Sequence, residues 1–288
     1  MNPAVFLYNN RFIPAHEIRI SPTNRAFFYG DGVFESIRVC GGQARFLESH
    51  YGRLLAGANQ LGLDLGELSF DRFVDQIQAL VQVNHIHNSA RIRYMLYRDE
   101  GGFYHPQTRS TCHFASIHTL DVSAYGSAQR ELRLCVYRDL PKWRNPLNAV
   151  KSLSSTLYIQ ACRYANERGF EDAVLLNEVD QVVECATSNI FIIQQNQITT
   201  PSLDSGCLPG VMREQLMVLA KQQGFVVREA DMDLLQLESA DEILLTNAIS
   251  GIRNATEFQG RLLKTGLGTQ LLDDLNKAVS SGWGLLGN

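Results

Sequence analysis

The stretch from residue 148 to residue 189 constrains the fold and the chemistry of this chain more than any other. It begins Asn-Ala-Val-Lys-Ser-Leu-Ser-Ser-Thr, with Lys151 at its centre, and continues into a predicted amphipathic helix that ends at Gly169. A predicted β-hairpin follows, and its second strand carries Glu184 in the apolar run Val-Val-Glu-Cys-Ala. A lysine in a weakly polar setting and a carboxylate inside a strand could together hold an aromatic aldehyde by both ends.

Length and composition narrow the class of protein. At 288 residues the chain is longer than most single cores, which predicts two domains. A composition of 45% hydrophobic and 19% charged residues is that of an ordinary globular protein, and a net charge of −4 gives no reason to expect nucleic acid or an anionic membrane as a partner. No apolar run is long enough to span a bilayer, and the first residues lack a signal-peptide pattern, so we expect a cytoplasmic protein.

Cysteine and histidine spacing gives no sign of a metal centre. The six cysteines are widely scattered, without the paired short spacing of a zinc site, and are expected to be small apolar core residues. The seven histidines form no His-Glu-x-x-His pattern. We therefore expect neither a structural nor a catalytic metal.

Hairpins and helices occur in both halves of the chain. The first half has predicted strands or hairpins over residues 5–13, 32–46, 90–97 and 112–118 and helices over 47–61 and 69–81. The second half has strands or hairpins over 132–137, 173–183, 190–199, 225–228 and 243–245 and helices that follow Lys151 or cover 211–223 and 267–279. Since strands and helices do not alternate serially, the pattern predicts an α+β fold.

A stretch of small residues separates the two halves. Residues 121–130 show no clear periodicity and are the predicted interdomain linker. We expect a small N-terminal α/β domain over residues 1–120 and a larger C-terminal domain over 131–288 that carries Lys151.

Lysines are scarce in this chain, and that scarcity makes Lys151 a notable residue. Only five of the 26 basic residues are lysines, so a mechanism that needs a lysine amine has few candidates. Partial desolvation by apolar neighbours favours the neutral amine, which is the nucleophilic form. The alternative interpretation is a surface lysine on a loop.

Three other features could bind a charged or aromatic ligand. A buried Glu184 would need a cationic partner, such as a protonated ring nitrogen, although it could also point to solvent from an edge strand. Arg53, beside an apolar helical stripe, has a fork suited to phosphate but could equally be a solvated helix flank. The turn Leu208-Pro209-Gly210 precedes a helix whose first N–H groups could bind an anion, as many helices could without doing so.

Taken together and in order, these features resemble the fold-type IV (class IV) pyridoxal-phosphate enzymes. That family includes branched-chain aminotransferases, D-amino-acid aminotransferases and aminodeoxychorismate lyases. The matching segments are Tyr-Gly-Asp-Gly-Val-Phe-Glu at 29–35, His-Tyr-Gly-Arg-Leu at 50–54, Lys151, Asp-Ala-Val-Leu-Leu-Asn at 172–177, Val-Glu-Cys-Ala-Thr-Ser-Asn-Ile-Phe at 183–191, Leu-Pro-Gly-Val-Met-Arg at 208–213 and Ala-Asp-Glu-Ile at 240–243. The resemblance covers nearly the whole chain.

The resemblance implies a two-domain fold with the active site between the domains, a pyridoxal 5′-phosphate cofactor and a homodimer. Lys151 would carry the cofactor and act as the catalytic base, with the rest of the cofactor held by Arg53, Glu184, Tyr158, Leu208, Val211, Met212 and Asn247. Residues that would face the substrate are Tyr29, Phe34, Ser36, Arg93, Arg98 and Ala248. Glu184 would pair with the pyridine nitrogen, and Arg53 with the backbone N–H groups of Val211 and Met212 would bind the phosphate.

Two reactions remain open at this point. We favour amino transfer between an amino acid, branched-chain-like or of the D series, and a 2-oxo acid. The alternative is elimination of pyruvate from 4-amino-4-deoxychorismate to give 4-aminobenzoate. Ser36, where branched-chain enzymes have glycine, and the segment Thr246-Asn247-Ala248 are closer to the lyase pattern.

Overall fold

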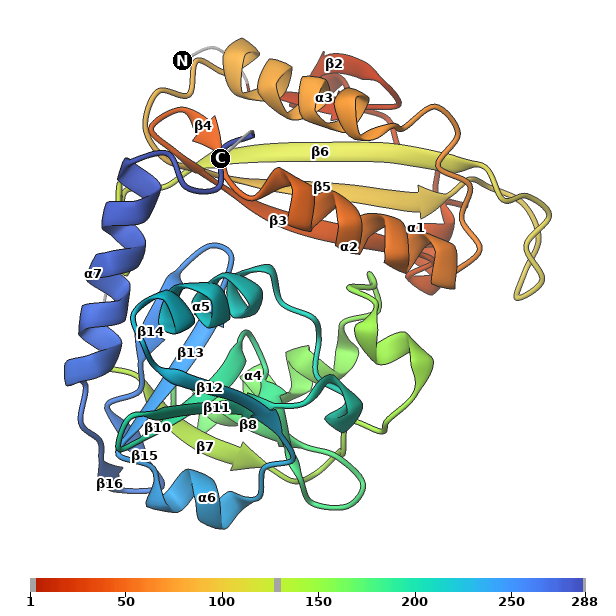
Figure 1. Ribbon diagram of the computed structural model, residues 1–288. Helices are drawn as coiled ribbons and strands as arrows, with labels where there is room; N and C mark the ends of the chain where they lie inside the picture. Colours follow the sequence, from red (N-terminus) through yellow and green to blue (C-terminus); the bar gives the residue numbers. More distant parts are fainter. Residues whose placement is uncertain (1–3, 127–130, 287–288) are drawn as a thin grey trace. The chain divides into compact units, whose positions relative to one another are not determined.

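Two units, each with a hydrophobic core of its own, make up the part of the chain described by the computed structural model, residues 4–126 and 131–286 (Figure 1). The first unit runs to Ser123 and adds Val150–Ser154 and the segment from Gly282 onward, whereas the second holds Ala124–Ala149 and Ser155–Ser281. The break after Ser123 falls within the expected linker, of which residues 127–130 lie outside the described residues.

The first unit is built on a six-stranded sheet in the order β2-β1-β6-β5-β3-β4, with every neighbouring pair antiparallel. Its strands are β1 (Val5–Tyr8), β2 (Arg11–Pro14), β3 (Gly32–Cys40), β4 (Gln43–Ala44), β5 (Ala90–Arg98) and β6 (Thr111–Thr119). Its helices are α1 (Arg25–Tyr29), α2 (Leu47–Gln60) and α3 (Phe70–Val83).

One face of this sheet is covered and the other carries the polar residues of interest. Alternate residues of β3 and β5, such as Val33, Ile37 and Ile92, are buried with the apolar stripes of α2 and α3. Ser69 caps α3 by accepting a hydrogen bond from the Arg72 backbone N–H at 3.2 Å. On the opposite face, Phe34 and Ser36 of β3 and Arg91, Arg93 and Met95 of β5 are only half-buried.

The second unit contains two five-stranded sheets, β12-β11-β10-β13-β14 and β16-β15-β7-β8-β9. The strands are β7 (Arg133–Tyr137), β8 (Asp172–Leu176), β9 (Val182–Cys185), β10 (Asn189–Gln194), β11 (Gln197–Pro201), β12 (Val226–Ala230), β13 (Glu242–Asn247), β14 (Gly251–Asn254), β15 (Glu257–Phe258) and β16 (Arg261–Leu262). The helices are α4 (Thr156–Glu167), α5 (Val211–Gln222), α6 (Leu234–Ser239) and α7 (Gly266–Ser280).

The core of the second unit explains why its strands read as continuous apolar runs. Every residue of β8 and β9 is buried, because side chains on one face join a cluster with β10 and β13 while those of β8 on the other face pack under α4. Strands β7 and β8 are parallel, and α4 lies between them in sequence. Antiparallel pairing of β8 with β9 and of β10 with β11 matches the predicted hairpins.

The structure departs from the expected elements in a few short pieces. Helix α1 was not predicted, because its five residues are too few to show a helical period. The short strands β14, β15 and β16 were also not predicted. Within residues 4–126 and 131–286, no helix is long and apolar enough to cross a membrane.

Candidate active site

Lys151 lies against the first unit, whereas the sequence led us to expect it in the C-terminal domain. Its segment is tied to β3 because the Phe34 N–H donates to the Lys151 carbonyl and the Leu153 N–H donates to the Gly32 carbonyl, both at 2.9 Å. Gly32 has no room for a side chain, since a Cβ there would lie 2.6 Å from the Leu96 carbonyl oxygen. This backbone pairing corrects the domain assignment of Lys151 and fixes its direction.

The amine of Lys151 and the guanidinium of Arg93 lie close to the same aromatic ring. Lys151 Nζ is 4.6 Å from the Phe34 ring centroid, and Arg93 Cζ is 3.9 Å from it. Ser36 pairs with Arg93 in the β3–β5 register, so the hydroxyl is on the same face. Its oxygen accepts a hydrogen bond of 3.3 Å from Arg91 Nη2. A primary amine, two guanidinium groups and a hydroxyl therefore share one face of the sheet.

Arg53 is held rigidly by a buried carboxylate. Glu35, on the covered face of β3, accepts from Arg53 Nε at 2.8 Å and from Arg53 Nη2 at 2.5 Å, while His50 Nδ1 lies 2.7 Å from the same carboxylate. Burial alone would raise the pKa of Glu35, but the charge and hydrogen bonds of Arg53, with those of His50, lower it to about 2. The pair uses Nε and Nη2 of Arg53 and thereby fixes the orientation of its guanidinium.

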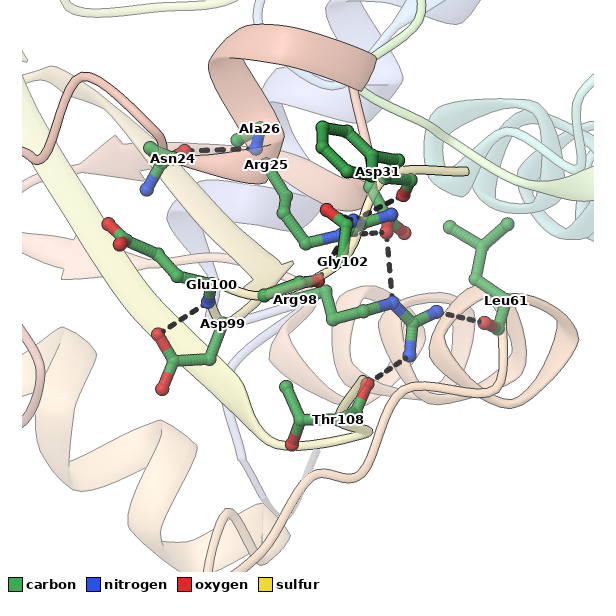
Figure 2. A network of polar contacts seen from close by, with 12 residues as sticks. Asn24, Arg25, Ala26, Asp31, Leu61, Arg98, Asp99, Glu100, Gly102 and Thr108 are labelled. Atoms are coloured by element: carbon green, nitrogen blue, oxygen red, sulfur yellow. Dashed lines mark hydrogen bonds and ion pairs between the residues drawn. The ribbon is translucent and has the colours of Figure 1, made fainter. Parts of the chain in front are cut away.

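Arg98 is engaged in holding loops together. Asp31 Oδ2 accepts from Arg98 Nε and from Arg25 Nε, each at 2.9 Å (Figure 2). The other nitrogens of Arg98 donate to the carbonyls of Leu61, Gly62 and Thr108. A guanidinium whose donors are used in this way favours a structural role, so we do not propose Arg98 as the residue that binds a substrate carboxylate.

Tyr29 belongs to the aromatic surface beside this network. Its ring centroid is 5.5 Å from that of Tyr104 and lies under the Arg25 guanidinium, 4.8 Å from Arg25 Cζ. Arg25 Nη1 in turn donates to the carbonyls of Gly101, Gly102 and Phe103, which fixes the loop that carries Tyr104. The structure thus gives Tyr29 a defined place on α1 without a hydrogen bond that would indicate its role.

Glu184 is buried in β9, in the second unit, and four donors surround its carboxylate. Oε1 accepts from Lys142 Nζ at 2.5 Å and from the Tyr158 hydroxyl at 3.0 Å. Oε2 accepts from the Leu208 N–H at 3.0 Å and, at 3.5 Å, from Asn189 Nδ2. Burial, and then the Glu184 charge, raise the pKa of Tyr158, so its hydroxyl stays protonated.

Lys142 was not recognised in the sequence as a site residue. It stands 42 positions from Glu184, in the segment Pro-Lys-Trp, and no local pattern connects the two. The scarcity of lysines was the one available signal. Its burial shows that Glu184 has a resident cationic partner in the protein itself.

The turn before α5 offers unused backbone donors. Gly210 is the N-cap of α5 and makes no side-chain capping bond. A Cβ at Gly210 would lie 1.9 Å from Asn189 Oδ1, so any other residue would displace the Asn189 side chain. Val211 and Met212, the first two residues of the helix, are buried, and their N–H groups lie in the first turn, where an anion is stabilised.

Asn247 closes the turn between β13 and β14. Its Oδ1 accepts from the backbone N–H groups of Ile249 at 3.0 Å and Ser250 at 2.8 Å, and Nδ2 donates to the Thr187 carbonyl at 3.3 Å. This geometry is a side-chain-stabilised turn and places Ala248 at its partly exposed tip. Asn247 therefore shapes the loop that the sequence associated with substrate choice.

Comparisons with known proteins match most of the chain. The family model of class IV amino-transferases matches residues 32–258. A Methanocaldococcus jannaschii protein with the provisional name branched-chain-amino-acid aminotransferase is 29% identical, over 96% of each chain. The D-alanine aminotransferase of Bacillus licheniformis is 24% identical, over 96% of this chain and 95% of its own.

Solved structures extend the same result. A branched-chain aminotransferase of Thermoproteus uzoniensis matches with a TM-score of 0.89 at 23% identity, over 96% of this chain and 95% of its own, which supports the fold. A Legionella pneumophila protein provisionally named 4-amino-4-deoxychorismate lyase matches with a TM-score of 0.81 at 27% identity, over 91% and 96%. Since the family model covers well over half of the chain, this protein belongs to the class IV aminotransferase family.

Proposed function

We propose that this protein transfers an amino group between an amino acid and a 2-oxo acid with pyridoxal 5′-phosphate as its cofactor. The observation that carries the proposal is the position of the Lys151 amine and the Arg93 guanidinium on the same ring, that of Phe34. An amine that can react with an aldehyde then has, at close range, a cation for an α-carboxylate.

The residues fit this cofactor when its three chemical parts are considered separately. A phosphate matches the oriented guanidinium of Arg53 and the uncapped first turn of α5. A ring nitrogen matches the buried carboxylate of Glu184, and a ring hydroxyl matches the nearby phenol of Tyr158. An aldehyde matches Lys151. When bound, pyridoxal phosphate supplies that aldehyde and a ring that withdraws electrons from the substrate's α-carbon.

Each side chain then has a defined task. Lys151 would hold the cofactor through its amine, and the same amine would act as the base that takes the substrate's α-proton. Glu184 would pair with the ring nitrogen and favour its protonation. Arg93 binds the substrate's carboxylate in the fixed orientation set by its stacking on Phe34. Val211, Met212 and Leu208 are proposed as cofactor contacts, as the family resemblance implies.

Pyruvate elimination from aminodeoxychorismate is the second candidate function. The observation that favours it is Ser36, whose hydroxyl shares the sheet face of Arg93 and is oriented by Arg91. A hydroxyl there could exchange a proton with a leaving group, which glycine could not do. The Legionella neighbour carries the provisional name of that lyase, and the Asn247 turn is consistent with it.

The expected homodimer and cytoplasmic location stay predictions.

One experiment separates the two reactions. Purified protein loaded with pyridoxal phosphate would be mixed with single L- and D-amino acids, and separately with aminodeoxychorismate, while the cofactor absorbance and products are recorded. Conversion of the cofactor to its amine form together with 2-oxo acid release is the expected result. Release of pyruvate and 4-aminobenzoate without net conversion of the cofactor would instead assign the lyase reaction. Failure of every substrate to change either readout would contradict both.

A further inference from the structure

Lys142 is a second lysine to be considered for the proposed function, because it contacts Glu184, the proposed partner of the cofactor's ring nitrogen. Its side chain is 5% exposed, and Nζ lies 2.5 Å from Glu184 Oε1. The backbone fixes it as well, because its N–H donates to the Leu176 carbonyl of β8 at 2.8 Å. A lysine this well buried is uncommon and requires a partner.

Lys142 is the charged member of the four hydrogen-bond donors described around the Glu184 carboxylate. The Tyr158 phenol is neutral because burial and Glu184 raise its pKa. Burial also raises the pKa of the nearby Cys207 thiol, to about 11, so that this group is neutral too. The remaining donors, Leu208 N–H and Asn189 Nδ2, carry no net charge. The ammonium of Lys142, 2.5 Å from Oε1, is therefore the positive charge in direct contact with the carboxylate in this cluster.

We propose that Lys142 is a positioning residue that sets how strongly Glu184 favours protonation of the cofactor's ring nitrogen. This inference rests on the proposed function. A carboxylate with no other cation would give a neutral pair with a protonated ring nitrogen. With Lys142 present, the same carboxylate faces two cations that repel each other, and the protonated ring is less favoured. Lys142 thus tempers the electron-withdrawing power of the ring while holding the carboxylate in place.

The test is nitrogen-15 NMR of protein loaded with ring-labelled pyridoxal phosphate, titrated between pH 5 and pH 10. In Lys142→Met, which keeps the length of the chain without its charge, the ring-nitrogen pKa should rise by about one unit or more. Lys142→Arg restores a cation and should return the titration towards that of the unmodified protein. The matched control is Lys264→Met, at an exposed lysine paired with Asp241, which should change nothing.

A second measurement follows the pair without cofactor. Thermal unfolding is compared for Lys142→Met, Glu184→Gln and the double variant, since each single change leaves one buried group unpaired and the double change leaves none charged. The double variant should unfold at a higher temperature than either single variant. If the decreases in unfolding temperature were additive, or if the ring-nitrogen pKa stayed unchanged or fell in Lys142→Met, the proposed role of Lys142 would be wrong while the proposed function would stand. Absence of bound cofactor in every variant and in the unmodified protein would overturn the proposed function with it.

Discussion

Two buried ion pairs, Glu35–Arg53 in the first unit and Lys142–Glu184 in the second, are built with opposite polarity. In the first unit a carboxylate lies in the covered face of a sheet and fixes an arginine. In the second unit a lysine lies in the core and fixes a carboxylate. The proposed function uses the arginine of one pair for a phosphate and the carboxylate of the other for a ring nitrogen.

The difference shows how a buried partner determines what the other member of the pair can bind. Arg53 is gripped through two nitrogens, so its orientation is defined and its charge is largely balanced by Glu35. Glu184 receives a single ammonium together with neutral donors, so its charge is balanced but its oxygens are approached from several directions. Buried pairs of this kind contribute little to net stability, and their value lies in geometry.

The Asp31 cluster gives a useful contrast to both pairs. Asp31 joins Arg25 and Arg98, and the two arginines spend their remaining donors on backbone carbonyls of neighbouring loops (Figure 2). That cluster stabilises the loops of the first unit, and most of its donors are engaged in hydrogen bonds within the protein. Burial of an arginine therefore does not by itself mark a binding residue; the partners of its donors decide.

Glu35→Gln should have the largest effect on stability. The change leaves the guanidinium of Arg53 buried without its counter-charge, so the free energy of unfolding should fall by about 3–5 kcal/mol in urea denaturation. Glu67→Gln is the control, because its partner Arg72 is at the surface and little change is expected. If the two variants were equally stable, the Glu35 pair would not be the rigid support described here.

Glu184→Gln should act mainly on the reaction. A neutral amide cannot favour protonation of the ring nitrogen, so turnover of the best amino-acid substrate should fall by about 100- to 1,000-fold. Stopped-flow absorbance of the loaded enzyme measures it. Glu171→Gln removes a surface pair with Arg133 in the same unit and should leave turnover near that of the unmodified protein. Equal turnover in both variants would remove Glu184 from the proposed mechanism.

Arg53→Lys keeps the charge but loses the two hydrogen bonds to Glu35 that orient the guanidinium. Affinity for pyridoxal phosphate, followed by fluorescence quenching, should fall by about 10- to 100-fold. Affinity for pyridoxal, which lacks the phosphate, should change little. A similar loss for both compounds would show that Arg53 supports the site without binding phosphate; Arg72→Lys serves as the surface control.

His50→Gln should have the smallest effect and a distinctive pH dependence. Burial lowers the pKa of His50, with Glu35 opposing this in part, so the folded protein keeps the ring neutral while the unfolded chain binds a proton below about pH 6.5. Stability should therefore fall as the pH drops below that value, by up to about 1.4 kcal/mol per pH unit from this residue. The variant should show a flatter profile, whereas exposed His16→Gln should not.

Much of the fold could be predicted from the sequence because its signals are local. Hairpins with strong apolar alternation and helices with clear stripes appear where they were expected. Strand alternation could also have shown that Arg98 differs in role from Arg91 and Arg93. Arg91 and Arg93 share one face of β5, whereas Arg98 is an odd number of positions from either and faces the side on which α2 packs.

The parts that escaped prediction depend on contacts distant in the sequence. Lys151 follows the linker and was expected with the second domain, but its backbone pairs with β3. Lys142 meets Glu184 only because the chain between them folds through α4 and two strands. No periodicity or motif in the sequence predicts this contact, so the burial of Lys142 could be known only from the structure.

Covalent mapping of the cofactor tests the central claim most directly. Protein incubated with pyridoxal phosphate is reduced with borohydride, digested and analysed by mass spectrometry to find the modified lysine. The account predicts a phosphopyridoxyl group on Lys151, with Lys142 unmodified. Modification of Lys142, or of no lysine at all, would contradict it.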